Sequence, residues 1–163
     1  MVMKAVFWSW LIAWFGCAAV SAQPVAVIGM ADMHNLLAKT DDTVRVVNFW
    51  ATWCGPCVAE MPYFERLERT KGPEKLQVIL VSLDFASQLE KRVVPFAKKR
   101  KLKSQVLLLD AGDPNEWIDQ VEPRWTGSIP ATLFLYRGKR IFYEGQISEQ
   151  ELRSYVEQVK RLP

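Results

Sequence analysis

Two cysteines separated by two residues form the part of this sequence best suited to chemistry. Cys54 and Cys57 enclose Gly55 and Pro56 and follow the apolar run 44–50, which has the pattern of a buried strand. A helix is expected to start here, because proline suits a first helical turn. The positive end of such a helix lowers a thiol pKa from about 8.5 to roughly 3.5–7.5. We therefore predict a redox site in which Cys54 attacks and the more buried Cys57 resolves the mixed disulfide.

Half of a zinc site and a purely structural disulfide are the alternatives for such a pair. Zinc requires about four ligands, whereas the sequence offers only Cys17, Cys54, Cys57 and His34. A structural disulfide across so short a loop adds little stability, because the entropic gain grows with loop length. His34 has no cysteine or carboxylate cluster beside it, which favours an exposed or capping role. We expect no metal and no cofactor other than the redox-active disulfide.

Predicted strands and helices alternate around the cysteines, which is typical of an α/β fold with parallel crossovers. Strands are expected at 24–29, 44–50, 76–83, 105–110, 131–136 and 140–144, the last two as an antiparallel hairpin. Helices are expected at 31–39, 55–69, 87–101, in a short segment from 113, and from the capping box 148–151 through 162.

Two motifs carry a resemblance to a known family. Residues 46–57 with Glu60-Met61-Pro62 resemble the active-site segment of TlpA/ResA-type proteins, the thioredoxin-like branch found in bacterial cell envelopes. Residues 127–132 resemble the cis-proline loop of the same family. The resemblance covers about residues 43–163. It implies a thioredoxin-like fold with a central mixed sheet flanked by helices, an N-terminal extension, and an inserted strand–helix unit at about 105–121.

The resemblance also implies roles for residues around the thiols. Pro130 is expected to be cis, in a loop that includes Ile129, faces the disulfide and pairs with an extended substrate segment. Asn48 stands where cytosolic thioredoxin has a buried aspartate that helps to move the proton of the second cysteine. Glu60 matches a glutamate that ResA-like proteins use near their thiols, so we expect it to tune Cys57 or relay its proton. The alternative is an ordinary helix glutamate facing water.

Three tryptophans near these motifs are candidates for a shallow apolar substrate surface. Trp53 precedes the first cysteine and is expected to be exposed, and Trp125 lies just before the proline loop. Trp53, Trp125 and Ile129 form the predicted substrate-binding set. For Trp125 and Trp50, packing in the core is an equal alternative.

The amino terminus has the pattern of a secretory signal peptide. Lys4 precedes an apolar run over 5–20, and Val20-Ser21-Ala22 suits cleavage before Gln23. An uncleaved anchor over 5–20 is the alternative, although the run is short against the roughly 20 residues of a spanning helix. Cys17 lacks the preceding residues that lipoprotein processing prefers. We expect residues 1–22 to be a signal peptide or anchor and 23–163 to be one domain, in the periplasm or otherwise exported.

Composition limits the partners. The net charge is +3 and half of the residues are hydrophobic, which favours a globular domain and gives no sign of nucleic-acid binding. The basic run 98–103 fits the solvated end of a helix. We expect a monomer that acts on disulfide-bearing proteins and receives electrons from a membrane thiol donor, because an exported dithiol needs an outside supply.

The predicted activity is the reduction of protein disulfides in the cell envelope, for example in cytochrome c maturation or thiol repair. The Gly-Pro pair between the cysteines resembles that of reducing thioredoxins. A dithiol oxidase or isomerase is the alternative within the same chemistry. A thioredoxin-like binding module without catalysis is the alternative from another class, and the presence of both cysteines argues against it.

Overall fold

A computed structural model gives the structure of the protein and describes residues 24–70 and 75–163. The predicted signal peptide or anchor at 1–22 lies outside these residues. Within the described ranges, no helix combines the length and apolar character needed to cross a membrane.

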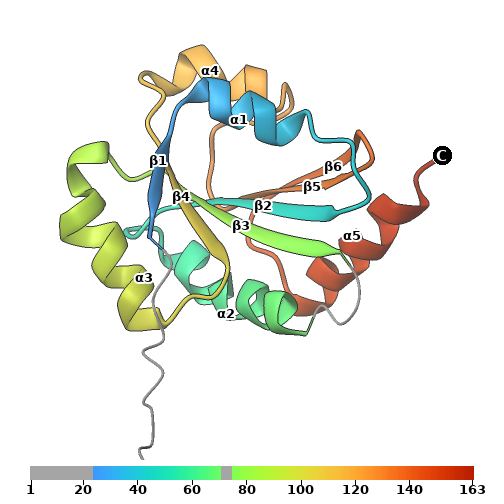
Figure 1. Ribbon diagram of the computed structural model, residues 1–163, viewed down its shortest axis with the longest axis horizontal. Coiled ribbons are helices and arrows are strands. Elements are labelled where there is room, and N and C mark those ends of the chain that lie inside the picture. The colour runs from blue at the N-terminus through green and yellow to red at the C-terminus, as the bar shows by residue number, and fades with distance from the viewer. Residues whose placement is uncertain (1–23, 71–74) are drawn as a thin grey trace, which may run out of the picture.

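A mixed sheet of six strands, in the order β1-β4-β3-β2-β5-β6, forms the centre of the fold (Figure 1). β2, β3, β4 and β1 are parallel, whereas β5 pairs antiparallel with β2 and β6 antiparallel with β5. The strands are β1 (Ala26–Ile28), β2 (Val44–Trp50), β3 (Leu76–Ser82), β4 (Gln105–Leu109), β5 (Ala131–Tyr136) and β6 (Lys139–Glu144). The expected mixed sheet is confirmed, and β2 lies near its middle.

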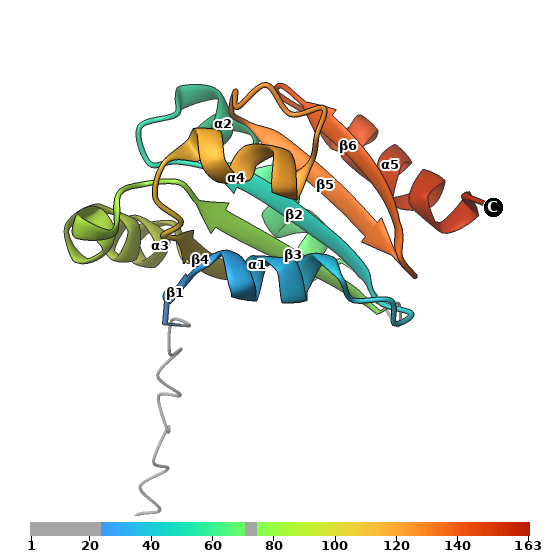
Figure 2. The ribbon, with the colours of Figure 1, turned by 90° about the horizontal axis from the view of Figure 1, so that it is seen from above.

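Helices cover both faces of the sheet. α1 (Met30–Leu37) and α4 (Pro114–Val121) lie on one face, and α2 (Gly55–Arg69) and α5 (Glu149–Arg161) lie on the other (Figures 1 and 2). β1 with α1 forms the expected N-terminal extension, and β4 with α4 forms the expected strand–helix unit. The capping box at the start of α5 is also confirmed, because Ser148 and Glu151 exchange hydrogen bonds between side chain and backbone.

β2 is buried along its whole length because it contributes to two hydrophobic cores. Val46 and Trp50 pack in the core on the side of α2 and α5, whereas Val47 and Phe49 pack in the core beneath α1 and α4. Alternate residues of a strand point to opposite faces, so a strand covered on both sides must be apolar nearly throughout. The strand that leads to Cys54 is thus held firmly from both faces of the sheet.

The segment 87–101 differs from the single helix expected there. The chain forms a 3₁₀ turn (Ala86–Gln88), a π-helical segment (Leu89–Val93) and then α3 (Val94–Arg100). In the π-helical segment the N–H of Val94 donates to the carbonyl of Leu89. Pro95 provides the physical reason, because it has no N–H to donate to Lys91 and its ring crowds that carbonyl.

Candidate active site

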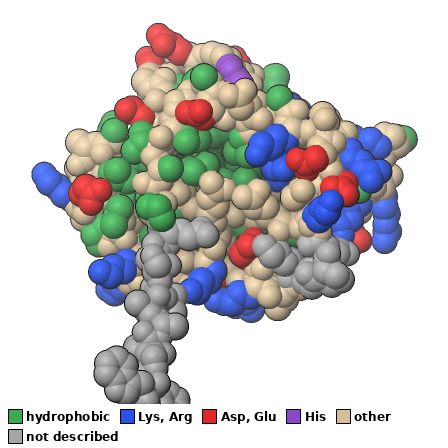
Figure 3. Space-filling view, in the orientation of Figure 1, with side chains coloured by type: hydrophobic (Ala, Val, Ile, Leu, Met, Phe, Trp, Pro, Cys, Tyr) green, Lys and Arg blue, Asp and Glu red, His purple; other side chains and the backbone are tan. Residues whose placement is uncertain are grey.

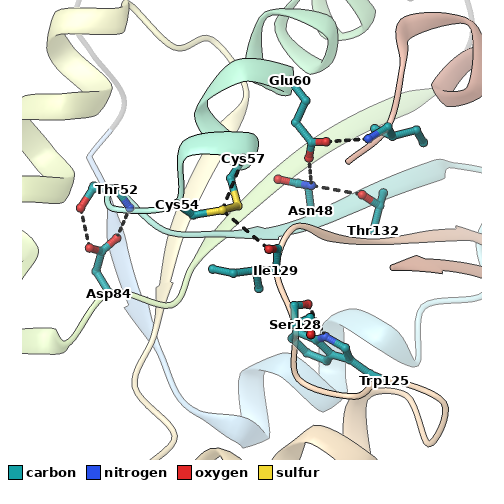
Figure 4. Close-up of a disulfide and its surroundings, with 11 residues drawn as sticks. Asn48, Thr52, Cys54, Cys57, Glu60, Asp84, Trp125, Ser128, Ile129 and Thr132 are labelled. Carbon is teal, nitrogen blue, oxygen red and sulfur yellow. Dashed lines mark hydrogen bonds between the residues drawn. A yellow bond between two sulfur atoms is a disulfide. The ribbon is translucent and has the colours of Figure 1, made fainter. Parts of the chain in front are cut away.

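The redox pair lies where β2 ends and α2 begins. Cys54 is the N-cap of α2, and its Sγ accepts a hydrogen bond of 3.3 Å from the N–H of Cys57. A disulfide joins the two residues, as Figure 4 shows. Cys54 is 6% exposed and Cys57 is fully buried. Of the two sulfurs, that of Cys54 is therefore the one that a partner can approach.

The loop before β5 faces the disulfide. The peptide bond between Ile129 and Pro130 is cis, as the resemblance implied. The carbonyl oxygen of Ile129 lies 3.8 Å from the Sγ of Cys54 (Figure 4). In the reduced protein this oxygen is placed to accept a hydrogen bond from the Cys54 thiol.

Two side chains hold this loop in place. Trp125 donates a hydrogen bond of 2.8 Å from its Nε1 to the carbonyl of Ser128. On the other side, the carboxylate of Glu144 accepts hydrogen bonds from the backbone N–H groups of Thr126 and Ser128, at 3.1 and 3.0 Å. Glu144 was not among the residues selected from the sequence, because its role depends on a contact across the β-hairpin.

Glu60 is fully buried behind the cysteines. Its Oε1 accepts a hydrogen bond of 3.0 Å from Asn48 Nδ2, and its Oε2 accepts one of 2.8 Å from the N–H of Ile147 (Figure 4). Asn48 Nδ2 also donates to Thr132 Oγ1 at 3.1 Å. Burial raises the pKa of Glu60 to about 7, although both hydrogen bonds act in the opposite direction. The alternative of a helix glutamate facing water is wrong.

An apolar groove of about 410 Å³ is lined by residues that adjoin Cys54, namely Trp53 before it in the chain and Ile129 opposite its sulfur. Trp53 is 64% exposed and Phe85 is 81% exposed, and both line the groove together with Ile129. Exposed aromatic side chains at the edge of a groove are typical of a surface that binds a partner. Phe85 was not predicted as a substrate-binding residue, because it follows a strand and belongs to no motif. The other lining residues are Leu83, Asp84, Ala86, Leu109, Asp110, Ala111, Gly112, Pro114, Trp117, Ile118 and Gly127.

Trp125 and Trp50 lie in the core and do not line the groove. Trp125 is 3% exposed and packs against Phe49 and Trp117, with ring centroids 4.6 and 5.7 Å away. Trp50 is fully buried and packs against Phe96. The alternative of packing in the core therefore describes both tryptophans, and Trp125 can affect a substrate only through the loop that it supports.

Asp84 is a second buried carboxylate at the site that sequence reasoning missed. It lies two residues after the end of β3 and accepts hydrogen bonds from both the backbone and the hydroxyl group of Thr52 (Figure 4). Its position at the carboxyl end of a parallel strand, next to the strand that carries the cysteines, was the available signal, because polar groups gather at that edge of a parallel sheet.

The described residues contain no group of three or more histidine, cysteine, aspartate or glutamate side chains arranged to hold a metal ion. His34 lies exposed on α1 and appears on the molecular surface in Figure 3.

Sequence comparison connects this site to known proteins. A model of the Redoxin family matches residues 33–152. The chain is 41% identical over 63 residues to the thioredoxin-like protein YneN of Bacillus subtilis (strain 168). That alignment covers 39% of this chain and 36% of YneN. It is 25% identical over 109 residues to sporulation thiol-disulfide oxidoreductase A of the same strain. That alignment covers 63% of this chain and 66% of the relative. The chain thus spans from about a third to about two thirds of these relatives.

Structural comparison agrees with the sequence match. The thioredoxin-related protein from Neisseria meningitidis serogroup B superposes with a TM-score of 0.64 at 22% identity, covering 75% of this chain and 88% of that chain. This likeness concerns the fold, which is thioredoxin-like. The family match contains both cysteines, Glu60 and the cis-proline loop and extends over most of the chain. The chain therefore belongs to the Redoxin family.

Proposed function

We propose that the protein is a thiol-disulfide oxidoreductase that reduces disulfides in other proteins of the cell envelope. The unequal exposure of the two cysteines is the observation that carries this proposal. Cys54 sits at a helix start, partly accessible and opposite the cis-proline loop, while Cys57 is enclosed beneath it. A disulfide with one accessible sulfur suits exchange with a partner, because attack and resolution then involve different sulfurs.

The reaction starts from the dithiol form of the protein. The Cys54 thiolate, stabilised by the start of α2, attacks one sulfur of the substrate disulfide, and the other substrate sulfur leaves and takes up a proton. Cys57 then loses its proton and attacks the Sγ of Cys54. The second substrate thiolate leaves and is protonated, and the Cys54–Cys57 disulfide forms. The substrate gains two electrons and two protons, which the dithiol loses.

Glu60 is proposed to receive the proton of Cys57. The two residues are three positions apart in α2, a spacing that brings side chains to the same face of a helix. A carboxyl group whose pKa is about 7 can accept a proton at neutral pH and release it again. Asn48 cannot serve as the base, and it acts here as a donor that orients Glu60.

The substrate is proposed to bind as an extended segment along the groove and the cis-proline loop. Trp53 and Phe85 offer apolar surface on the groove, and the backbone of Ile129 offers hydrogen bonds next to Cys54. Trp125 contributes by holding the carbonyl of Ser128. Pro130 shapes the loop and cannot itself donate to a substrate backbone.

Location and partners are also proposals. The apolar run after Lys4 and the small residues before Gln23 support export, with retention of 5–20 as a membrane anchor as the alternative. In an oxidising compartment the dithiol must be restored by a membrane thiol donor. Disulfides of apocytochrome c or of other exported proteins are the proposed substrates, and the protein is proposed to act as a monomer.

A trapping experiment tests the function. The Cys57→Ser variant should accumulate a mixed disulfide between Cys54 and substrate proteins, because resolution is blocked, and the Cys54→Ser/Cys57→Ser variant should not. The wild-type dithiol should also reduce insulin with dithiothreitol as donor. Absence of both signals would reject the function, and partner binding that survives in the double variant would instead identify a binding module.

A further inference from the structure

Asp84 is a buried carboxylate that the proposed reaction steps do not use. The residue is 3% exposed, although it lines the groove together with Trp53 and Ile129. Its Oδ1 accepts a hydrogen bond of 2.6 Å from Thr52 Oγ1. Its Oδ2 accepts bonds from the N–H of Thr52 at 2.9 Å and from Ser82 Oγ at 2.7 Å. All three partners are donors, an arrangement that suits an ionised carboxylate.

These bonds connect the chain after β3 to the turn that carries Cys54. Trp50 and Ser82 are opposite each other in neighbouring parallel strands, and the N–H of Leu83 donates to the carbonyl of Trp50 at 2.8 Å. Beyond that point β2 has ended, and Asp84 holds Thr52, two residues before Cys54 (Figure 4). Asp84 therefore fixes the approach of the chain to the N-cap position of α2.

The same carboxylate brings a negative charge to Thr52, two residues before the sulfur that must become negative. The start of α2 favours the Cys54 thiolate, whereas a nearby carboxylate opposes it. Asp84 and Asp110 are the charged residues that line the groove, and the described lining includes no lysine, arginine or histidine. Glu60 adds a carboxyl group on the Cys57 side, in α2. The charged residues of the groove lining are thus acidic, and so is the buried Glu60 in α2.

Opposing the thiolate affects the redox equilibrium of the pair. A stabilised thiolate stabilises the reduced form and makes a disulfide more oxidising, as the comparison of thioredoxin with DsbA illustrates. A carboxylate that opposes the thiolate acts in the other direction. It makes the dithiol a stronger reductant.

We propose that Asp84 is a positioning residue that holds the turn before Cys54 and whose charge keeps the cysteine pair reducing. This inference rests on the proposed function, since it concerns the direction in which electrons flow. It requires neither a particular substrate nor a particular donor.

Asp84→Asn separates the charge from the hydrogen bonds. Its amide oxygen can accept from the Thr52 N–H and from Ser82, while the Thr52 hydroxyl can rotate to accept from the new amide group. Equilibration with glutathione should show an equilibrium constant moved about tenfold toward the dithiol, which is a reduction potential about 30 mV less negative. The pKa of the Cys54 thiol, followed by thiolate absorbance in the Cys57→Ser background, should fall.

Two controls separate this effect from loss of structure. Thr52→Val removes one hydrogen bond and keeps the charge of Asp84. The equilibrium constant measured against glutathione should therefore change by less than about threefold. Glu65→Gln neutralises another buried carboxylate, which is 5% exposed and binds the N–H groups of Lys103 and Ser104 near the start of β4. That variant should lose thermal stability and keep the wild-type potential.

The outcomes are distinguishable. A folded Asp84→Asn protein with the wild-type potential, or with a more negative one, overturns the proposal. An equal shift in Thr52→Val assigns the effect to geometry and overturns the role of the charge. Asp84→Ser provides a second neutral variant if Asp84→Asn does not fold. Because potential and thiol pKa are measured without a protein substrate, failure of this inference is separate from failure of the trapping experiment.

Discussion

Glu60 and Asn48 are joined by a hydrogen bond of 3.0 Å in the interior of the protein, behind the cysteine pair. Asn48 lies in the strand that leads to the thiols, and Glu60 lies in the helix that starts at them. The pair also contacts the chain far away in sequence, through Thr132 and Ile147. Asn48 thus connects this buried pair to the segment just after the cis-proline loop, and the Glu60 carboxyl group connects the redox helix to the chain just before α5.

The first prediction concerns the pH dependence of turnover. If ionised Glu60 takes the proton of Cys57, release of the trapped substrate should become faster as the pH rises through about 7, the pKa of Glu60. Glu60→Gln should remove this rise and slow release above pH 7 by about tenfold or more. Stopped-flow measurement of single turnovers between pH 5 and 9 checks the result. Glu65→Gln, in the same helix, is the matched control, and an unchanged profile in Glu60→Gln would exclude the relay.

The second prediction concerns the pH dependence of stability. Burial raises the pKa of Glu60 from 4.5 to about 7, so the folded protein holds this proton more tightly than the unfolded chain does. The associated stability is complete below about pH 4.5 and is lost as the pH rises to about 7, by up to about 3 kcal/mol. Urea unfolding of the oxidised protein at a series of pH values should show this fall. Glu60→Gln should lack it, and a parallel fall in that variant would place its origin elsewhere.

The parts of the site that could be predicted from the sequence are those whose signal is local. The cysteine spacing, the apolar run of β2 and the segment before β5 each carry their information within about ten residues, so the redox pair and the cis peptide bond at Pro130 were predicted correctly. The single helix predicted over 87–101 was wrong, because Pro95 cannot donate an N–H and the chain forms a π-helical segment before α3.

The rest depends on contacts between distant parts of the chain. Glu60 meets Ile147 across 87 positions, and Thr52 meets Asp84 across 32. No periodicity or spacing encodes such pairs, so the burial of Glu60 and the hydrogen bonds between Asp84 and Thr52 could not be predicted from the sequence. Aromatic residues were ambiguous for a related reason. Trp125 is in the core and Phe85 is 81% exposed, yet both occur in loops beside apolar strands.

The third prediction isolates the support of the cis-proline loop. Trp125→Phe keeps most of the packing against Phe49 and removes the hydrogen bond to Ser128, which is worth about 1 kcal/mol. We expect kcat/KM for insulin to fall about fivefold, while reduction of a small disulfide such as hydroxyethyl disulfide is unchanged. Phe142→Leu, at a ring whose centroid lies 6.4 Å from that of Trp125 and which does not line the groove, is the packing control. Equal losses for both disulfides in Trp125→Phe would contradict a role specific to the loop.

The fourth prediction tests the groove as the surface that binds protein substrates. Phe85 is 81% exposed, so Phe85→Ala should change the free energy of unfolding by less than about 0.5 kcal/mol. If a substrate side chain covers this ring, KM for a protein substrate should rise several-fold with kcat nearly unchanged, because the contact contributes equally to substrate and transition state. Val27→Ala is the matched control, since Val27 is an exposed apolar residue of β1 outside the groove lining. Equal KM values for the two variants would remove Phe85 from the binding surface, whereas a fall in kcat alone would indicate that the ring acts on the cysteines instead.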